Sequence, residues 1–180
     1  MRYGSHYKAG VRQMFREMRR NKQLLSEKES IEILKNATSG VLALLGDDEY
    51  PYAVPISYVY DDSKIYFHGA KTGHKIDAIR KCNKASFCVI SQDEIVPEKY
   101  TTYFKSVIAF GKVRILENDK EIRGAIEKLA IKYHPKDSKE NRNQAIDREW
   151  KPLCMIEFSI EHMTGKEAIE LTRMRNSKGE

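Results

Sequence analysis

The sequence predicts a mainly β protein, built as a small barrel of about six mostly antiparallel strands with two or three peripheral helices. Runs of strand-forming residues recur along the chain, and most connections between neighbouring runs are short. The helical stretches are too few to alternate with the strands as βαβ units. A length of 180 residues with 41% apolar composition suits one domain with its own core.

The first half of this domain is expected to start with a helix and continue as hairpins. Ser26 and Glu29 form a capping box at the start of the helix, which we expect to end near Asn36. Three strand-like stretches follow, separated by turn residues, so that the second stretch pairs with the first and with the third. These strands are Gly40–Leu45, Tyr52–Tyr60 and Ile65–His68.

The second half is expected to contain three strands and one clear helix, and Gly111 marks a bulge or a close backbone approach. The strands are Ala85–Ser91, Tyr103–Glu117 and Leu153–Ile160, and the helix is Lys120–Tyr133. Three stretches are expected to be irregular, the first because it lacks a regular period and the second because it is polar and begins with Pro135. They are a loop at Gln92–Thr102, a mobile excursion at His134–Asp147, and a turn at Met163–Lys166 before a tail of helix-forming character.

The N-terminal residues are predicted to form a basic amphipathic arm. Val11, Met14, Phe15 and Met18 share one helical stripe, and arginines occupy the other faces. Such a segment can bind membranes or nucleic acid, but docking of its apolar side on the body or on a partner subunit is the favoured interpretation. The chain therefore divides into an arm at residues 1–25, a domain at residues 26–172 and a tail at residues 173–180.

Composition and charge exclude some classes of function. The longest clear apolar run, Val41–Leu45, is far shorter than a membrane span, and no hydrophobic signal region opens the chain, so we expect a cytoplasmic protein. The three cysteines form no CxxC pair and are expected to be reduced thiols. A net charge of +6 permits an anionic ligand or nucleic acid but establishes neither.

A glycine-containing loop followed by a short helix forms a candidate phosphate site. The loop contains Gly69 and Gly73, and the helix starts with His74 and Lys75. Free N–H groups make a helix start positive, so two basic residues there are unfavourable unless an anion joins them. A phosphate held by these N–H groups and the lysine would satisfy both. From the spacing alone, a plain loop with solvated basic residues fits equally well.

Metal and hydrolase chemistry are not indicated. His68 and His74 stand six residues apart, and no carboxylate or cysteine completes a metal-ligand spacing with them. Ser57 and Ser106 lie in predicted strands without the glycine pattern of a nucleophile elbow. The single tryptophan, Trp150, is interpreted as a core or interface residue rather than a ligand contact.

Three segments, taken in order and with their spacing, resemble the pyridoxamine 5′-phosphate oxidase-like flavoproteins, and the nitroimidazole-resistance (Nim) branch in particular. They are VPISYVYDDSKIYFHGAKTGHKIDAIR at residues 54–80, YFKSVIAFGKVRIL at 103–116 and LCMIEFSIEHMTGK at 153–166. The likeness covers residues 12–172. It implies a split β-barrel homodimer that binds two FMN molecules at the subunit interface. The domain at residues 26–172 would then be the FMN-binding barrel.

The resemblance also implies which residues contact the cofactor. The segment that follows the isoalloxazine ring with its backbone would be Val54, Pro55, Ile56 and Ser57. The ribityl chain and phosphate would be bound by His68, Gly69, Gly73, His74 and Lys75. A polar side chain that reaches the flavin would be Ser106, and a C-terminal segment closing the site from the partner subunit would contain Met163, Thr164 and Lys166.

Two departures from the true pyridoxamine phosphate oxidases concern their substrate. Those enzymes carry arginine at the start of the strand bordering the flavin, where this chain has Ala53. Their arginine-bearing C-terminal motif is replaced here by His162–Lys166. The anchors for a vitamin B6 phosphate are therefore absent, and we do not expect a B6 oxidase.

The resemblance thus implies an FMN-dependent reductase of a small organic substrate such as a nitroaromatic. No catalytic residue is assigned, because the flavin itself performs the redox chemistry. Two alternatives remain: a flavin-binding or flavin-sensing module without turnover, and a haem- or deazaflavin-binding relative. The expected partners are a second copy of the chain and a small-molecule substrate, with no nucleic acid, membrane or metal.

Overall fold

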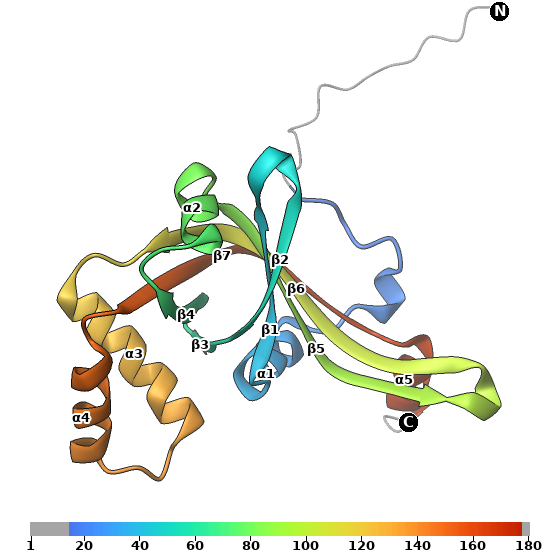
Figure 1. Ribbon diagram of the computed structural model, residues 1–180. Helices are drawn as coiled ribbons and strands as arrows, with labels where there is room; N and C mark the ends of the chain where they lie inside the picture. Colours follow the sequence, from blue (N-terminus) through green and yellow to red (C-terminus); the bar gives the residue numbers. More distant parts are fainter. Residues whose placement is uncertain (1–14, 178–180) are drawn as a thin grey trace, which may run out of the picture.

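The computed structural model describes residues 15–177 and contains one antiparallel sheet of seven strands, in the order β2-β1-β5-β6-β7-β4-β3 (Figure 1). The strands are β1 (Ser39–Leu45), β2 (Pro51–Ser57), β3 (Val59–Asp61), β4 (Lys64–Ala70), β5 (Lys84–Val96), β6 (Thr101–Ile115) and β7 (Leu153–Glu167). The helices are α1 (Glu27–Asn36), α2 (His74–Lys81), α3 (Asp119–Tyr133), α4 (Lys139–Glu149) and α5 (Ile169–Ser177). The predicted mainly β class with peripheral helices is confirmed.

The sheet closes into a barrel because β2 and β3 follow each other in the chain but lie at opposite ends of the strand order. Tyr58, the residue between them, is fully buried and donates its hydroxyl to the Leu34 carbonyl oxygen at 2.8 Å. Its ring packs edge-on against Phe87, which in turn contacts Phe67. These aromatic rings fill the inner face of the curled sheet together with Leu42, Phe158 and other apolar side chains.

The prediction that Tyr52–Tyr60 forms one strand paired with Ile65–His68 is wrong in part. β2 pairs with β1 along its whole length, and only β3 pairs with β4. Tyr58 and Val59 are consecutive and both buried, so the alternation of inner and outer side chains breaks where the chain changes partner. A period-two pattern identifies a strand, but it does not identify the neighbouring strand.

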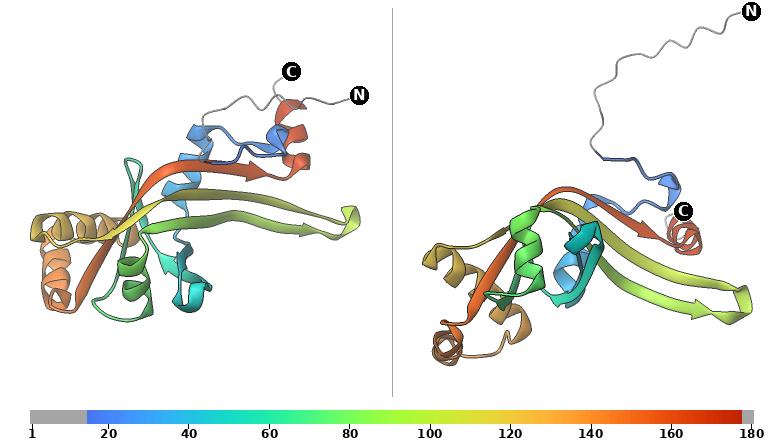
Figure 2. Two further views of the ribbon diagram at one scale, coloured as in Figure 1. Left: turned by 90° about the horizontal axis from the view of Figure 1, so that it is seen from above. Right: turned by 45° about the horizontal axis from the view of Figure 1, so that its top comes forward.

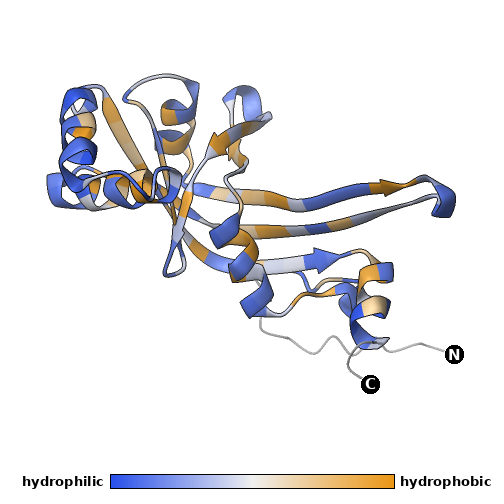
Figure 3. Cartoon of the chain, turned by 90° about the horizontal axis from the view of Figure 1, so that it is seen from below, coloured by the Kyte–Doolittle hydropathy of each residue, from blue (hydrophilic) through white to orange (hydrophobic). Residues whose placement is uncertain are grey.

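The predicted loop at Gln92–Thr102 is also wrong, because β5 and β6 continue through it as a long hairpin. The two strands pair as far as Val96 and Thr101, with a bulge between Ile90 and Gln92. The hairpin projects well beyond the barrel (Figures 2 and 3). Ile95, near its tip, is 74% exposed. The bulge shifts the alternation by one residue, which removes the regular period from the sequence.

Two further irregular stretches are regular in the structure. The predicted mobile excursion at His134–Asp147 contains most of α4, whose N-cap Ser138 accepts a hydrogen bond from the Asn141 N–H at 3.1 Å. This helix buries only Ile146, so its sequence has almost no apolar period. The predicted turn at Met163–Lys166 lies within β7, paired with β6.

Other local predictions are confirmed. α1 starts with the reciprocal capping box of Ser26 and Glu29 and ends at Asn36. The sheet is irregular beside Gly111, where an added Cβ would lie 2.0 Å from the Ser159 carbonyl oxygen. The tail of helix-forming character is α5.

The N-terminal arm is described only from Phe15 onward. Val11 and Met14, two members of its apolar stripe, lie outside the described residues. The Phe15 ring stacks on His162 with the ring centres 4.8 Å apart and lies 5.7 Å from the Phe110 ring. The described end of the arm therefore packs against the barrel.

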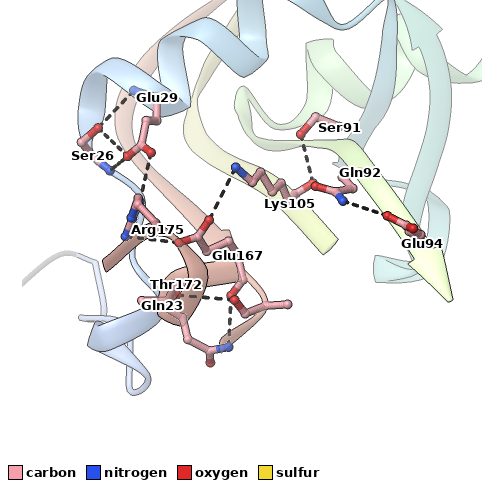
Figure 4. A network of polar contacts seen from close by, with 11 residues as sticks. Gln23, Ser26, Glu29, Ser91, Gln92, Glu94, Lys105, Glu167, Thr172 and Arg175 are labelled. Atoms are coloured by element: carbon pink, nitrogen blue, oxygen red, sulfur yellow. Dashed lines mark hydrogen bonds and ion pairs between the residues drawn. The ribbon is translucent and has the colours of Figure 1, made fainter. Parts of the chain in front are cut away.

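Two buried glutamates on β7 bind cations from neighbouring elements. Glu157 accepts hydrogen bonds from Lys64 at 3.0 Å and Arg114 at 2.8 Å, and although burial opposes ionisation, these bonds lower its pKa. Glu167 lies 3.6 Å from the ammonium group of Lys105 and 3.2 Å from the guanidinium group of Arg175 (Figure 4). These contacts connect β6 and α5 to the last strand.

The helices leave part of the outer sheet surface uncovered. α3 packs on the outer side of β3, β4 and β7, where Met155 and Tyr66 are buried beneath it. Strand pairing places Pro55, Val41, Cys88, Ile108 and Thr164 side by side on the outer face of β2, β1, β5, β6 and β7. We call this surface the bare outer face. Val41 and Ile108 are 36% and 41% exposed on it.

Candidate functional site

A cavity of about 660 Å³ lies between the α3–α4 helix pair and the edge of the barrel. One wall comes from the strands and contains Ser57, His68 and Gly69, three of the residues predicted to contact a cofactor. The opposite wall comes from α3, α4 and the residues around them. The structure therefore brings the end of β2 and the end of β4 together in one hollow.

Two strand edges meet beside this cavity. β2 is the last strand at one end of the sheet order, so one of its backbone edges has no ladder partner. It comes close to β4 without pairing with it. Backbone N–H and C=O groups at such a gap are available to the polar atoms of a ligand.

Side chains on β2 point alternately inward and outward. Val54 pairs with Leu42, which is fully buried in the barrel core, and Ile56 packs against the same core. Of the four predicted contact residues on β2, only Pro55 and Ser57 therefore lie on the outer face. To a ligand on the outer face, Val54 and Ile56 therefore offer backbone groups rather than their side chains.

His68 lies on the outer face of β4, opposite Met155 of β7. Burial lowers its pKa, and the positive charge of Lys75 lowers it further. The imidazole is therefore neutral at pH 7, and a neutral ring can donate and accept a hydrogen bond at the same time.

Lys75 is a half-buried cation in the first turn of α2. Gly73, the N-cap residue, has a φ of 115°, a left-handed conformation that favours glycine. A Cβ on Gly69 would lie 3.0 Å from the Lys75 ammonium nitrogen, so this glycine lets the ammonium group approach β4 closely. Burial lowers the pKa of Lys75, and within residues 15–177 no carboxylate acts on it.

His74 points in a different direction from Lys75. Its ring stacks on Tyr52 with ring centres 4.0 Å apart, and its Nε2 lies 3.7 Å from an Asp47 carboxylate oxygen. The side chain is therefore engaged by the hairpin of β1 and β2. At the start of α2, His74 can still contribute its backbone N–H to an anion.

The remaining predicted site residues form a second group on β6 and β7. Ser106 and Lys166 are direct cross-strand partners, and Thr164 lies opposite Ile108 on the bare outer face. Met163 faces inward, opposite the buried Ala109. Thr164 lies nine residues beyond Met155, the partner of His68 on β7, which corresponds to about 30 Å along the strand. One chain therefore does not bring the two groups together.

Comparison with known proteins identifies the family. The model of the pyridoxamine 5′-phosphate oxidase family matches residues 26–167. The chain belongs to this family. Among curated proteins, no sequence matches the chain.

Several solved structures share the fold at low sequence identity. A candidate 5-nitroimidazole antibiotic resistance protein from Bacteroides thetaiotaomicron is 21% identical, with a TM-score of 0.69 over 80% of this chain and 86% of that one. A FAD-binding protein from Mesorhizobium loti is 23% identical, with a TM-score of 0.57 over 81% and 97%. A FAD- and haem-binding protein from Mycobacterium smegmatis is 17% identical, with a TM-score of 0.64 over 82% and 73%. The split-barrel fold is thereby shown.

Sequence reasoning predicted the α3 side of the helix wall but missed the α4 side. Arg142 and Ile146 line the cavity from α4, in a region that was predicted to be irregular. The capping residue Ser138 was the available signal for a helix start. Within residues 15–177 no cluster of metal-binding side chains occurs, and none of the helices described there is long and apolar enough to span a membrane.

Proposed function

We propose that this protein binds FMN and acts as a reductase of small organic molecules such as nitroaromatics. The observation that carries the proposal is Lys75, a half-buried cation without a carboxylate partner in the described chain. It lies at a glycine-capped helix start beside the cavity that contains Ser57 and His68. This arrangement fits a phosphate group with a polar ring system next to it.

The residues suit an FMN molecule in the following way. Lys75 and the first N–H groups of α2 would bind the phosphate, and the free edge of β2 would bind the polar rim of the ring. Ser57 and His68 would line the ring through side chains that can both donate and accept hydrogen bonds. The flavin would supply the two-electron chemistry, and the protein would orient it and exclude water.

The proposed assembly is a homodimer formed through the bare outer face. Ser106, Thr164 and Lys166 lie on this face, about 30 Å along β7 from the level of His68. They can contact the same flavin as Lys75 only if they come from a second copy of the chain. The apolar side chains of this face, including Val41 and Ile108, are suited to an interface between copies.

One experiment tests two points: whether the cofactor is FMN rather than FAD, and whether the protein reduces a substrate rather than storing flavin. The purified protein should be yellow, and heat-released cofactor should have the mass of FMN. After anaerobic reduction with NAD(P)H, added nitrobenzene should reoxidise the flavin rapidly, giving nitrosobenzene and water from two electrons and two protons. A reduced flavin that nitrobenzene does not oxidise would favour a storage or sensing role. An absorption spectrum typical of haem would contradict the proposal of a flavin cofactor.

A further inference from the structure

The helix wall of the cavity has a composition distinct from its strand wall. Whereas the strand wall offers Ser57 and His68, about half of the residues of the helix wall are aliphatic. Its apolar members are Ile126, Leu129, Ala130, Ala145 and Ile146. A molecule bound against these helices therefore meets mostly apolar surface, while its other side faces β4.

We propose that this helix wall is the substrate-binding surface, and that it takes a neutral, flat aromatic molecule carrying one oxygen acceptor. The inference rests on the proposed function, because a flavin along β2 and β4 would form the opposite side of the same chamber. Ligand sites of this kind are mostly apolar with a few oriented polar groups. The helix pair would thus determine which substrate meets the flavin.

The polar groups of the helix wall define the ligand further. The Tyr133 hydroxyl is engaged by the Thr38 carbonyl oxygen and the Tyr58 N–H. His134 lies 3.8 Å from a carboxylate oxygen of Asp137. At that distance His134 forms no hydrogen bond with the carboxylate, so of these two groups only the Tyr133 hydroxyl is already occupied within the protein.

Arg142 is the cation available to a ligand on this wall. Its guanidinium group donates to the Asp137 carbonyl oxygen at 3.4 Å and forms no ion pair within residues 15–177. The carboxylates of Asp137 and Glu149 also line the cavity, so the local charge does not favour an anionic ligand. A neutral acceptor such as a nitro group can accept from Arg142 without meeting this repulsion.

The only tryptophan provides a direct readout of the chamber. Trp150 caps α4, lies between the lining residues Glu149 and Pro152, and has the Arg123 guanidinium 5.9 Å from its ring centre. Nitroaromatic molecules quench indole fluorescence at short range. Saturable quenching of Trp150 would therefore report occupancy of the chamber, whatever the redox activity of the protein.

The experiment titrates the purified protein, with its bound cofactor, with nitrobenzene and with benzoate while Trp150 fluorescence is recorded. Wild type should show saturable quenching by nitrobenzene and at least tenfold weaker binding of benzoate. Ala145→Phe should weaken nitrobenzene binding at least tenfold by filling the chamber. Gln144→Phe, on the exposed neighbouring position outside the lining, should bind as wild type. Arg142→Ala should weaken binding severalfold.

Flavin content and melting temperature are measured for every variant, so that an unfolded protein is recognised. If Ala145→Phe does not fold, Ala130→Leu on α3 tests the same wall. Equal binding by wild type and a folded cavity-filling variant, or tighter binding of benzoate than of nitrobenzene, would overturn the inference. Parallel loss of flavin and nitrobenzene in Ala145→Phe would assign the chamber to the flavin. A protein without flavin that still shows Ala145-dependent quenching would refute the proposed function alone.

Discussion

At the scale of single residues, Lys75 is the best defined part of the proposed site. A cation at a helix start meets the positive end of the helix dipole, and partial burial adds a cost by removing water from the charge. Neither effect stabilises the fold. The negative charge of a bound phosphate would offset both costs, by attracting the ammonium group and the positive end of the helix dipole. A lysine is therefore suited to this position.

Lys75→Ala should weaken FMN binding by roughly ten- to a hundredfold, since a hydrogen bond to a charged group contributes roughly 1.5–3 kcal/mol. Riboflavin, which lacks the phosphate, should bind the wild type poorly and lose little more in the variant. Flavin-fluorescence titration of both proteins with both ligands isolates the interaction of the lysine with the phosphate. Lys71→Ala, an exposed lysine in the preceding loop, is the control. Equal losses for FMN and riboflavin would place the phosphate elsewhere.

At the scale of elements, the close approach of β6 and β7 at the irregular point of their pairing depends on Gly111. Its missing Cβ leaves room for the Ser159 carbonyl oxygen of β7, and a backbone atom cannot move aside as a flexible side chain can. Gly111→Ala should therefore lower the free energy of unfolding by roughly 1–3 kcal/mol or more. Gly124→Ala on α3, where nothing lies within 4 Å of an added Cβ, should raise it by about 0.5–1 kcal/mol. Urea denaturation monitored by circular dichroism compares the two, and a neutral Gly111→Ala would contradict the packing.

Elements with local signals could be predicted from the sequence, and those set by distant contacts could not. The capping box of α1, the apolar face of α3 and the bulge at Gly111 are readable because a few neighbouring residues determine them. The change of partner at Tyr58 depends on barrel closure, which involves residues far apart in the chain. α4 was not predicted because it buries a single side chain, so the α4 side of the helix wall was missed as well.

The candidate site shows the same division. The glycines and lysine around α2 form a contiguous segment, and the structure places them together as the sequence suggests. The direction of the His74 ring depends on Tyr52 and Asp47 in another hairpin, and no local pattern indicates it. Whether Val54 offers a side chain or only its backbone depends on which face of β2 is inward, and pairing with β1 decides this.

At the scale of the whole molecule, the bare outer face predicts that two copies of the chain associate through it. Ile108→Glu places a charge in the middle of the proposed interface, where association would remove it from water, and should convert the proposed dimer to monomer. Ile131→Glu, an exposed position on α3 of similar exposure, should leave the dimer intact. Light scattering coupled to size exclusion gives the mass. Because the second group of site residues would come from the partner, the monomer should also lose flavin. A wild-type monomer that retains FMN would exclude this interface.

The projecting hairpin has a consequence for the local stability of the isolated chain. Beyond Lys105, β6 no longer pairs with β7, and its edge keeps only isolated bonds, from the Ala168 N–H to the Phe104 carbonyl oxygen and from the Thr101 hydroxyl to Glu170. The tip is therefore close to a two-stranded ribbon, with the edge of β5 open. Such a ribbon is only marginally stable in water. Its backbone amides should therefore exchange with deuterium through local opening, long before the amides of the barrel exchange. A second subunit covering this ribbon would slow that exchange, so deuterium uptake at residues 92–104 would measure how far the interface extends along the hairpin.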